Sequence, residues 1–170
     1  MFRNFAVLAL AAAVLCGCML QSRAPIYGDK DAALVLGPKG GIVKMSDWKN
    51  GRWVETDDER VEIGAVGKHY VVKSKTDVEL HFVKLKGNWF VVQGVETGSA
   101  AVYMLAEVKD HGAEGRVLAC KDLKANAAVA RWITHEGDDC FVKPGTMAKE
   151  LFTALLDNPG APTFRMEIIH

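Results

Sequence analysis

The feature that most constrains the fold is a series of short apolar segments, separated by turn residues, that covers most of the chain. Each segment is rich in Val, Leu, Ile or aromatic residues, and Gly, Asn, Asp or Lys residues stand between them. Short strands at this spacing, with no long helical pattern between them, predict an antiparallel β meander curled into a sheet or partial barrel. The expected strands are 32–36, 42–45, 61–66, 69–73, 78–85, 89–93, 100–109 and 116–119.

One turn in this series has a strong local signal. Asn50 and Gly51 lie between Trp48 and Trp53, and both turn residues tolerate the positive φ angles of a type I′ turn. The sequence therefore predicts a hairpin here. Tryptophans near a hairpin end can line a surface for a sugar or a partner. We interpret Trp48, Trp53 and the later Trp89 first as structural residues that fill the core or pair across strands.

The sequence after Cys120 predicts a small helical part. Asp122 is a candidate N-cap for a first helix, whose apolar residues recur at helical spacing: Leu123, Ala127, Ala130 and Ile133. A second helix is expected after Pro144, with one apolar face: Met147, Leu151 and Leu155. A last strand is expected over 163–169. The predicted class is α+β, an antiparallel β meander or partial barrel followed by a small two-helix part with a terminal strand.

The composition limits the function classes. The chain has 170 residues with 21 basic and 21 acidic side chains, and no stretch is dominated by Lys and Arg. Binding to nucleic acid needs concentrated positive charge, so we exclude nucleic acid as a partner. The length suits one domain with a hydrophobic core.

The first residues are typical of a secretory signal. Arg3 precedes an apolar segment over 5–15, which is too short to cross a bilayer, because a helix needs about 20 residues for that. The segment ends in Leu15-Cys16-Gly17-Cys18, and this run resembles the lipobox of bacterial lipoproteins. An ordinary secretory signal, in which Cys16 and Cys18 are incidental, is the alternative.

The resemblance to lipoproteins implies where the chain is cut and where it resides. It implies cleavage before Cys18, which would carry a diacylglyceryl group on its thiol and an acyl group on its freed amine. Met19, in place of the Asp that signals inner-membrane retention in this family, implies the periplasmic side of the outer membrane. The expected organisation is a signal peptide over 1–17, a lipidated tether over 18–30 and a single β-rich domain over 31–170.

Two further cysteines, Cys120 and Cys140, are expected to form a disulfide, since an exported chain meets an oxidising compartment. On the chain-entropy account such a bridge contributes roughly 3 kcal/mol. The alternative is that one of them is a catalytic thiolate, for which His111 and His135 are near in sequence. Sequence proximity does not establish that geometry.

No pattern of histidines, carboxylates or serines indicates a reaction centre or a cofactor. His69 and His81 are expected in neighbouring strands and could face one another, but we interpret them as partly exposed strand histidines and assign no metal site. Asp57 and Asp58 belong to an acid cluster that is typical of a solvated turn, and a glycosidase would need a fixed carboxyl separation. Neither a Gly-x-Ser-x-Gly elbow nor a Gly-rich phosphate loop is present. We therefore assign no catalytic and no cofactor-binding residue.

Five short motifs make the chain similar to uncharacterised proteins of alphaproteobacteria, and this resemblance implies no activity. They are 89–93, 103–105, 120–123, 139–140 and 151–155. The leading functional hypothesis is a non-enzymatic outer-membrane lipoprotein that binds an envelope protein or another envelope component. The alternatives are a small barrel that carries an apolar ligand and an envelope hydrolase that uses carboxylates or His81.

Overall fold

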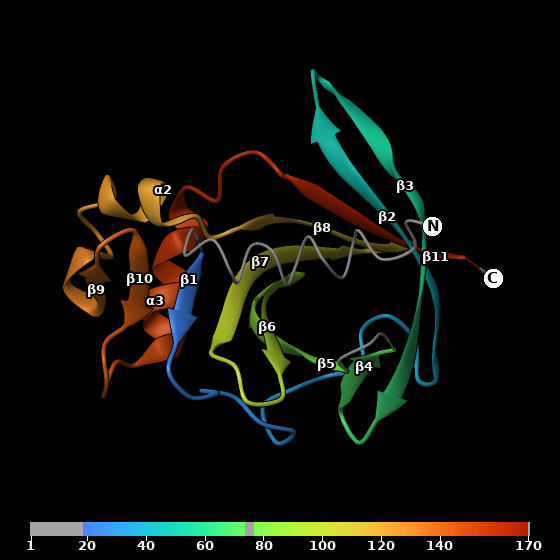
Figure 1. The fold of residues 1–170 in the computed structure, drawn as a ribbon, viewed down its shortest axis with the longest axis horizontal. Helices are drawn as coiled ribbons and strands as arrows, with labels where there is room; N and C mark the ends of the chain where they lie inside the picture. The colour runs from blue at the N-terminus through green and yellow to red at the C-terminus, as the bar shows by residue number, and fades with distance from the viewer. Residues whose placement is uncertain (1–18, 74–76, 170) are drawn as a thin grey trace.

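Eight antiparallel strands form a closed barrel in the computed structural model, which describes residues 19–73 and 77–169 without the side chains of residues 56–59 (Figure 1). Seven of the strands follow one another along the chain, and each pairs with the next. The barrel strands are β2 (Gly40–Lys49), β3 (Arg52–Val66), β4 (His69–Val72), β5 (Val78–Lys86), β6 (Trp89–Glu96), β7 (Ala101–Lys109), β8 (Gly112–Val117) and β11 (Phe164–Ile169).

The C-terminal strand β11 closes the barrel. It pairs with β2 through Met166 and Met45, and with β8 through Met166 and Ala113, so both of its edges are hydrogen-bonded. The sequence predicts a terminal strand and a partial barrel. The strand is confirmed, but the partial barrel understates the fold, because β11 fills the gap between β2 and β8 and leaves a closed ring.

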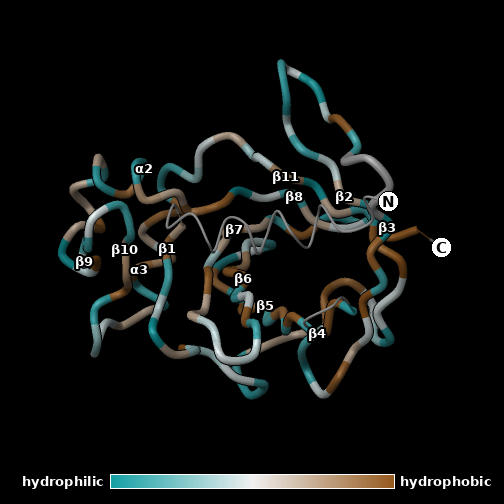
Figure 2. Tube along the Cα trace, viewed as in Figure 1, coloured by the Kyte–Doolittle hydropathy of each residue, from teal (hydrophilic) through white to brown (hydrophobic). Residues whose placement is uncertain are grey.

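Apolar side chains that alternate along the strands fill the barrel interior. Tyr70 and Phe82 are fully buried there and meet edge to face at 5.9 Å between ring centroids. An eight-stranded barrel is just wide enough for side chains to fill. Figure 2 shows the hydrophobic stretches of these strands. The buried interior residues include Val43, Ile63, Val72, Val78, Leu80, Phe90, Val92, Met104, Phe164 and Met166.

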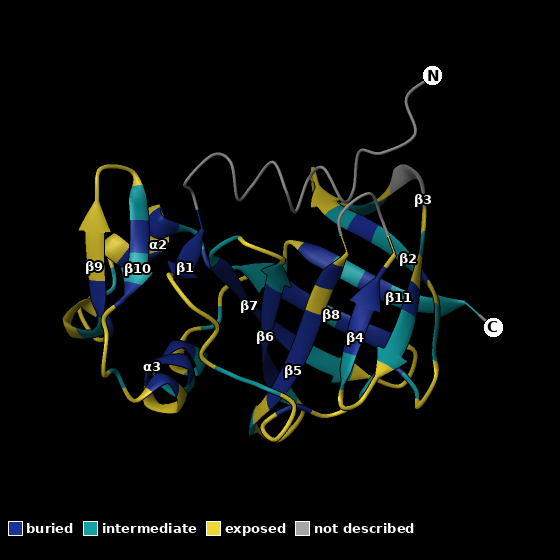
Figure 3. Ribbon diagram, turned by 60° about the horizontal axis from the view of Figure 1, so that its bottom comes forward, coloured by how far each residue is buried: buried dark blue, intermediate teal, exposed yellow. Residues whose placement is uncertain are grey.

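A second hydrophobic core lies on the outer wall of the barrel. Outward-facing residues of β5, β6 and β7, among them Val83, Val91 and Leu105, pack against the segments that precede β2 and follow β8. Figure 3 shows that β5, β6 and β7 are largely buried although they form the barrel wall. The packing elements are β1 (Leu20–Ser22), α2 (Cys120–Lys124), η1 (Ala130–Trp132), β9 (Ile133–Glu136), β10 (Asp139–Val142), α3 (Ala148–Ala154) and η2 (Leu155–Asp157).

The first predicted helix is much shorter than its sequence pattern suggests. Helix α2 ends at Lys124, and its N-cap is Ala119 rather than the predicted Asp122. The chain turns at Asn126, whose side-chain oxygen accepts a hydrogen bond from the Ala128 N–H. Asn can bind the backbone two residues ahead and so favours a turn over a helix. Ile133 therefore begins strand β9 instead of continuing the helix.

The second predicted helix is α3, continued by the single turn η2. Leu151 and Leu155 are buried as predicted, but Met147 is 61% exposed because it lies before the helix as its N-cap. A disulfide joins Cys120 at the start of α2 to Cys140 in β10 and confirms the predicted pairing. The disulfide thus connects α2 covalently to β10.

The expected tether over 18–30 differs from the structure in its first described residues. Met19 is bridged to Ala119 and packs with the barrel-interior residues, while Leu20 is fully buried in the outer core. Strand β1 then pairs with β7 in the antiparallel sense and with β10 in the parallel sense. The chain therefore enters the sheet directly after residue 18.

Candidate functional site

A segment of residues 23–33, here called the strap, runs from β1 across the outer wall to β4. Figure 1 shows it in blue, along the ends of β6 and β5. Gln93 on β6 is fully buried beneath it and binds it at three points. Its side-chain oxygen accepts hydrogen bonds from the Ile26 and Tyr27 N–H groups at 2.8 and 3.0 Å, and its amide donates to the Tyr27 carbonyl at 2.9 Å. Gln93 thus binds the middle of the strap, and the strap also binds β5 through the Ala33 N–H, which donates to the Phe82 carbonyl at 2.9 Å.

A buried hydroxyl extends this network to β1. Tyr103 on β7 donates a hydrogen bond to Gln93 at 3.2 Å and lies 2.6 Å from the Ser22 hydroxyl. Burial raises the pKa of Tyr103 to about 12, since the charged phenolate is disfavoured away from water. The Tyr103 hydroxyl therefore stays neutral and available for hydrogen bonding at physiological pH.

The strap brings the carboxylate of Asp29 to a pair of histidines on β4 and β5. The register of β4 and β5 pairs Tyr70 with Leu80, which places the adjacent His69 and His81 opposite each other. Their rings stack with centroids 4.7 Å apart and an angle of 22° between their planes. Asp29 on the strap contacts His69 through Oδ1 and Nδ1 at 2.5 Å. This hydrogen bond lowers the pKa of the exposed Asp29 carboxyl.

The two histidines differ in their surroundings. His81 is only 5% exposed, and its Nε2 lies 3.2 Å from a carboxylate oxygen of Glu79. Its Nδ1 is buried and has no hydrogen-bond partner among the described residues. The expectation of two partly exposed strand histidines is therefore wrong for His81, which is buried and stacked on His69. One ligand atom from each of Asp29, His69 and His81 lies within 4.8 Å of the others.

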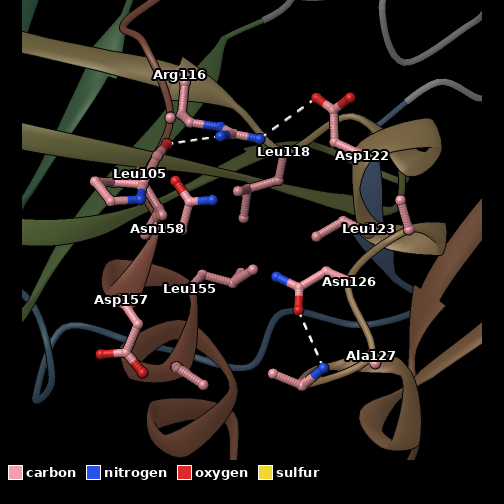
Figure 4. A pocket seen from close by; sticks show the side chains of 15 residues that line it. Leu105, Arg116, Leu118, Asp122, Leu123, Asn126, Ala127, Leu155, Asp157 and Asn158 are labelled. Atoms are coloured by element: carbon pink, nitrogen blue, oxygen red, sulfur yellow. Dashed lines mark hydrogen bonds and ion pairs between the residues drawn. The ribbon is translucent and has the colours of Figure 1, made fainter.

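A cleft of about 760 Å³ lies elsewhere on the outer wall, between α2 and the end of η2. Figure 4 shows its apolar floor, which includes Leu105, Leu118 and Leu155, and the Arg116 guanidinium at its rim. Arg116 donates to the Pro159 carbonyl at 2.7 Å and pairs with Asp122 at 3.4 Å. The charged groups thus connect the two walls. Among the described residues, His81 does not line this cleft.

The tip of the β2–β3 hairpin projects beyond the barrel (Figure 1). Trp48 and Trp53 are paired across the strands, with ring centroids 5.0 Å apart in an edge-to-face arrangement. Asn50 and Gly51 have φ angles of 52° and 76°, which confirms the predicted hairpin turn. Trp48 is 44% exposed, so the pair presents an aromatic surface to solvent.

The barrel wall supports this tryptophan pair from below. The Arg165 guanidinium on β11 lies 4.4 Å from the centre of the Trp53 ring. Its Nε donates to Glu114 on β8 at 2.7 Å. Burial opposes ionisation of Glu114, but its bonds to Lys109 and Arg165 outweigh this and lower its pKa. Glu114 is therefore a carboxylate that fixes Arg165, and Arg165 fixes Trp53.

The structure also places the remaining residues that the sequence analysis considered as site candidates. Because Cys120 and Cys140 are joined, the alternative of a catalytic thiolate is wrong. His111 and His135 are both exposed. Trp89 is half-buried against the outer core, in agreement with a structural role.

Several predicted features lie outside the residues that the structure describes. The signal over 1–17 and Cys18 lie outside the described residues, as do the side chains of Asp57 and Asp58. Across residues 19–73 and 77–169, helices are too short or too polar to cross a bilayer.

Comparisons with protein-family models, with curated proteins and with solved structures find no match to this chain.

Proposed function

We propose that the chain is a lipoprotein on the periplasmic side of the outer membrane, and that its domain binds another envelope protein without catalysing a reaction. The observation that carries the binding role is the exposed tryptophan pair on the projecting β2–β3 hairpin. Anchoring at Cys18 is supported by the lipobox resemblance alone.

The hairpin tip has the properties of a binding anchor. Tryptophan is enriched among the residues that contribute most to protein interfaces. Trp53 is held by Arg165, and Trp48 packs on Trp53, so little side-chain entropy remains to be lost on binding. The rim carries charges of both signs, in the pairs Lys49–Asp47 at 2.9 Å and Lys44–Glu55 at 2.6 Å. The expected partner is a protein with an apolar pocket and a rim of mixed charge.

The barrel interior gives less support to an apolar-ligand carrier. Tyr70, Phe82 and the other interior residues occupy the space that such a ligand would need. For a hydrolase, the described residues offer no observation that favours it, because His81 does not line the described cleft. Binding of a protein by the hairpin tip requires neither an internal cavity nor a reactive group.

A photo-crosslinking residue in place of Trp48, in the full-length protein in its own cells, tests this function. We expect a discrete crosslinked protein, which mass spectrometry identifies. Once that protein is purified, its affinity for this chain can be measured. Trp48→Ala is expected to raise the dissociation constant of the complex at least tenfold, which corresponds to about 1.4 kcal/mol. The matched control is Met147, which is 61% exposed on the outer elements, and Met147→Ala is expected to change the constant less than twofold.

Two results would contradict the proposal. One is crosslinking of Trp48 to lipid alone, because tryptophan also favours the membrane interface and the tip would then contact the bilayer. The other is a partner whose affinity is the same for Trp48→Ala and the unchanged protein, because the hairpin tip would then not be the binding surface.

The anchor is tested separately by Cys18→Ser. The variant is expected to lose its acyl chains and to leave the membrane fraction, because serine has no thiol to accept the diacylglyceryl group. Intact-mass measurement and fractionation check this result. The control is Cys16→Ser, which keeps Cys18 and is expected to stay acylated. A Cys18→Ser protein that is still acylated and membrane-bound would refute the anchor.

A further inference from the structure

We propose that Asp29, His69 and His81 bind one divalent transition-metal ion on the outer wall of the barrel. The three residues come from the strap, β4 and β5, and one candidate ligand atom from each lies within 4.8 Å of the others. The proposal does not depend on the hairpin tip or on the lipid anchor.

The residue types select the class of metal. Two imidazoles and a carboxylate suit zinc and its neighbours in the first transition series, whereas magnesium and calcium prefer oxygen ligands alone. Zinc binds nitrogen and carboxylate oxygen at about 2.0–2.2 Å, so tetrahedral ligands lie roughly 3.3 Å from one another. Ligand atoms near the 4.8 Å limit must therefore approach by up to roughly 1.5 Å, whereas Asp29 Oδ1 and His69 Nδ1, which lie 2.5 Å apart, must separate by about 0.8 Å. Both changes are within the range of a side-chain rotation.

The three candidate ligands differ in how far their side chains can move toward an ion. His69 and His81 are stacked on neighbouring strands of the barrel, so their backbone positions are fixed by the β4–β5 pairing. Asp29 lies on the strap and is exposed, with side-chain exposure of 50%. We infer that the histidines provide a fixed pair of ligands and that the Asp29 carboxylate closes onto the ion.

The burial of His81 is the second observation that points to a ligand. Buried polar groups in proteins are nearly always hydrogen-bonded, yet Nδ1 of His81 has no partner among the described residues. Glu79 lies 3.2 Å from the other ring nitrogen and can orient the ring, as carboxylates do for metal-binding histidines. An unpartnered nitrogen on an oriented, buried ring is an available metal ligand.

The electrostatic surroundings also favour a cation. Asp29 and Glu79 place two carboxylates next to the two imidazole rings. A divalent ion would balance this negative charge. It would also connect the strap to the β4–β5 pair through direct bonds, two residues after the point where Gln93 binds Tyr27.

Zinc binding to the purified full chain in detergent tests the proposal, measured by competition with a chromophoric chelator. We expect one zinc ion per chain, and at least tenfold weaker binding for each of Asp29→Asn and His69→Gln. The matched control is His135→Gln, which changes an exposed histidine on β9 and is expected to alter the affinity less than twofold. Cobalt in place of zinc is expected to give the strong visible absorption of a tetrahedral site.

The variants are chosen so that misfolding does not decide the outcome. His81→Gln changes a buried residue and can disturb the fold, whereas Asp29→Asn changes an exposed carboxyl and keeps a similar shape. Failure of the unchanged protein to compete for zinc would overturn the proposal. Equal zinc affinity in Asp29→Asn, His69→Gln and His135→Gln would also overturn it, because the bound ion would then lie elsewhere.

Discussion

Gln93→Leu is expected to lower the free energy of unfolding by about 3–5 kcal/mol. Leucine has a similar size but cannot form hydrogen bonds, so the N–H groups of Ile26 and Tyr27 and the Tyr27 carbonyl would lose their partner. A polar group left unsatisfied in a buried position costs about 1–3 kcal/mol. Gln93 is fully buried, so water reaches these groups only if the strap moves away from the wall. Urea denaturation gives the loss of stability.

The matched control for Gln93→Leu is Tyr103→Phe, which removes one hydroxyl from the same network. We expect a loss of about 1–1.5 kcal/mol for that change, since fewer groups lose a partner. Hydrogen exchange at Ile26 and Tyr27 is expected to become faster in Gln93→Leu. Equal stability of the two variants would mean that Gln93 is not what holds the strap.

Replacement of both Cys120 and Cys140 by alanine is expected to lower the free energy of unfolding by about 3 kcal/mol, with a range of about 2–5. The disulfide restricts the unfolded chain between the two residues, and this restriction is lost in the variant. Alanine is chosen because both positions are buried, where a serine hydroxyl would need a partner. Urea denaturation again measures the change.

The effect of the disulfide should also be local. Strand β9 pairs with β10, and β10 is connected to the barrel sheet through the three-residue strand β1. We therefore expect the amides of β9 and β10 to lose exchange protection before those of β5 and β6. The unchanged protein under reducing conditions should match the double variant. Labelling of both cysteines in the unreduced protein would contradict the bridge and this prediction.

The local features of the fold follow from the sequence, whereas its closure does not. The turn at Asn50 and Gly51 is predictable because the required φ angles select those two residues. Strand β11 is predictable as a strand from its alternation, but not as the partner of β2. That pairing joins residues more than 100 positions apart and depends on the register of the whole barrel. Closure is therefore a property of the complete sheet.

The predicted helix through Ala127 is wrong because the turn at Asn126 ends it, a signal that the apolar spacing does not contain. Leu123, Val129 and Ile133 are all buried in the outer core although they do not share one helix. The disulfide was predictable from the cysteine count and the expected export. Its position at the junction of α2 and β10 was not.

The candidate metal site was also only partly predictable from the sequence. That His69 and His81 could face each other follows from two neighbouring strands, and the β4–β5 register confirms it. The approach of Asp29 comes from the strap, and Asp29 is 40 residues from His69 in the chain. A sequence pattern carries no signal for such a covering segment, because the strap has neither strand nor helix periodicity.

The burial of Met19 has a mechanical consequence for the proposed anchor. Met19 is only 1% exposed and is already bridged to Ala119, so a lipid on Cys18 would have no flexible linker before the folded domain. The domain could not swing away from the bilayer, and its orientation would be set by the point where β1 enters the sheet. The domain would then meet a partner by lateral diffusion in the membrane plane. It could bind only a site on the partner whose distance from the bilayer does not exceed the dimensions of the barrel.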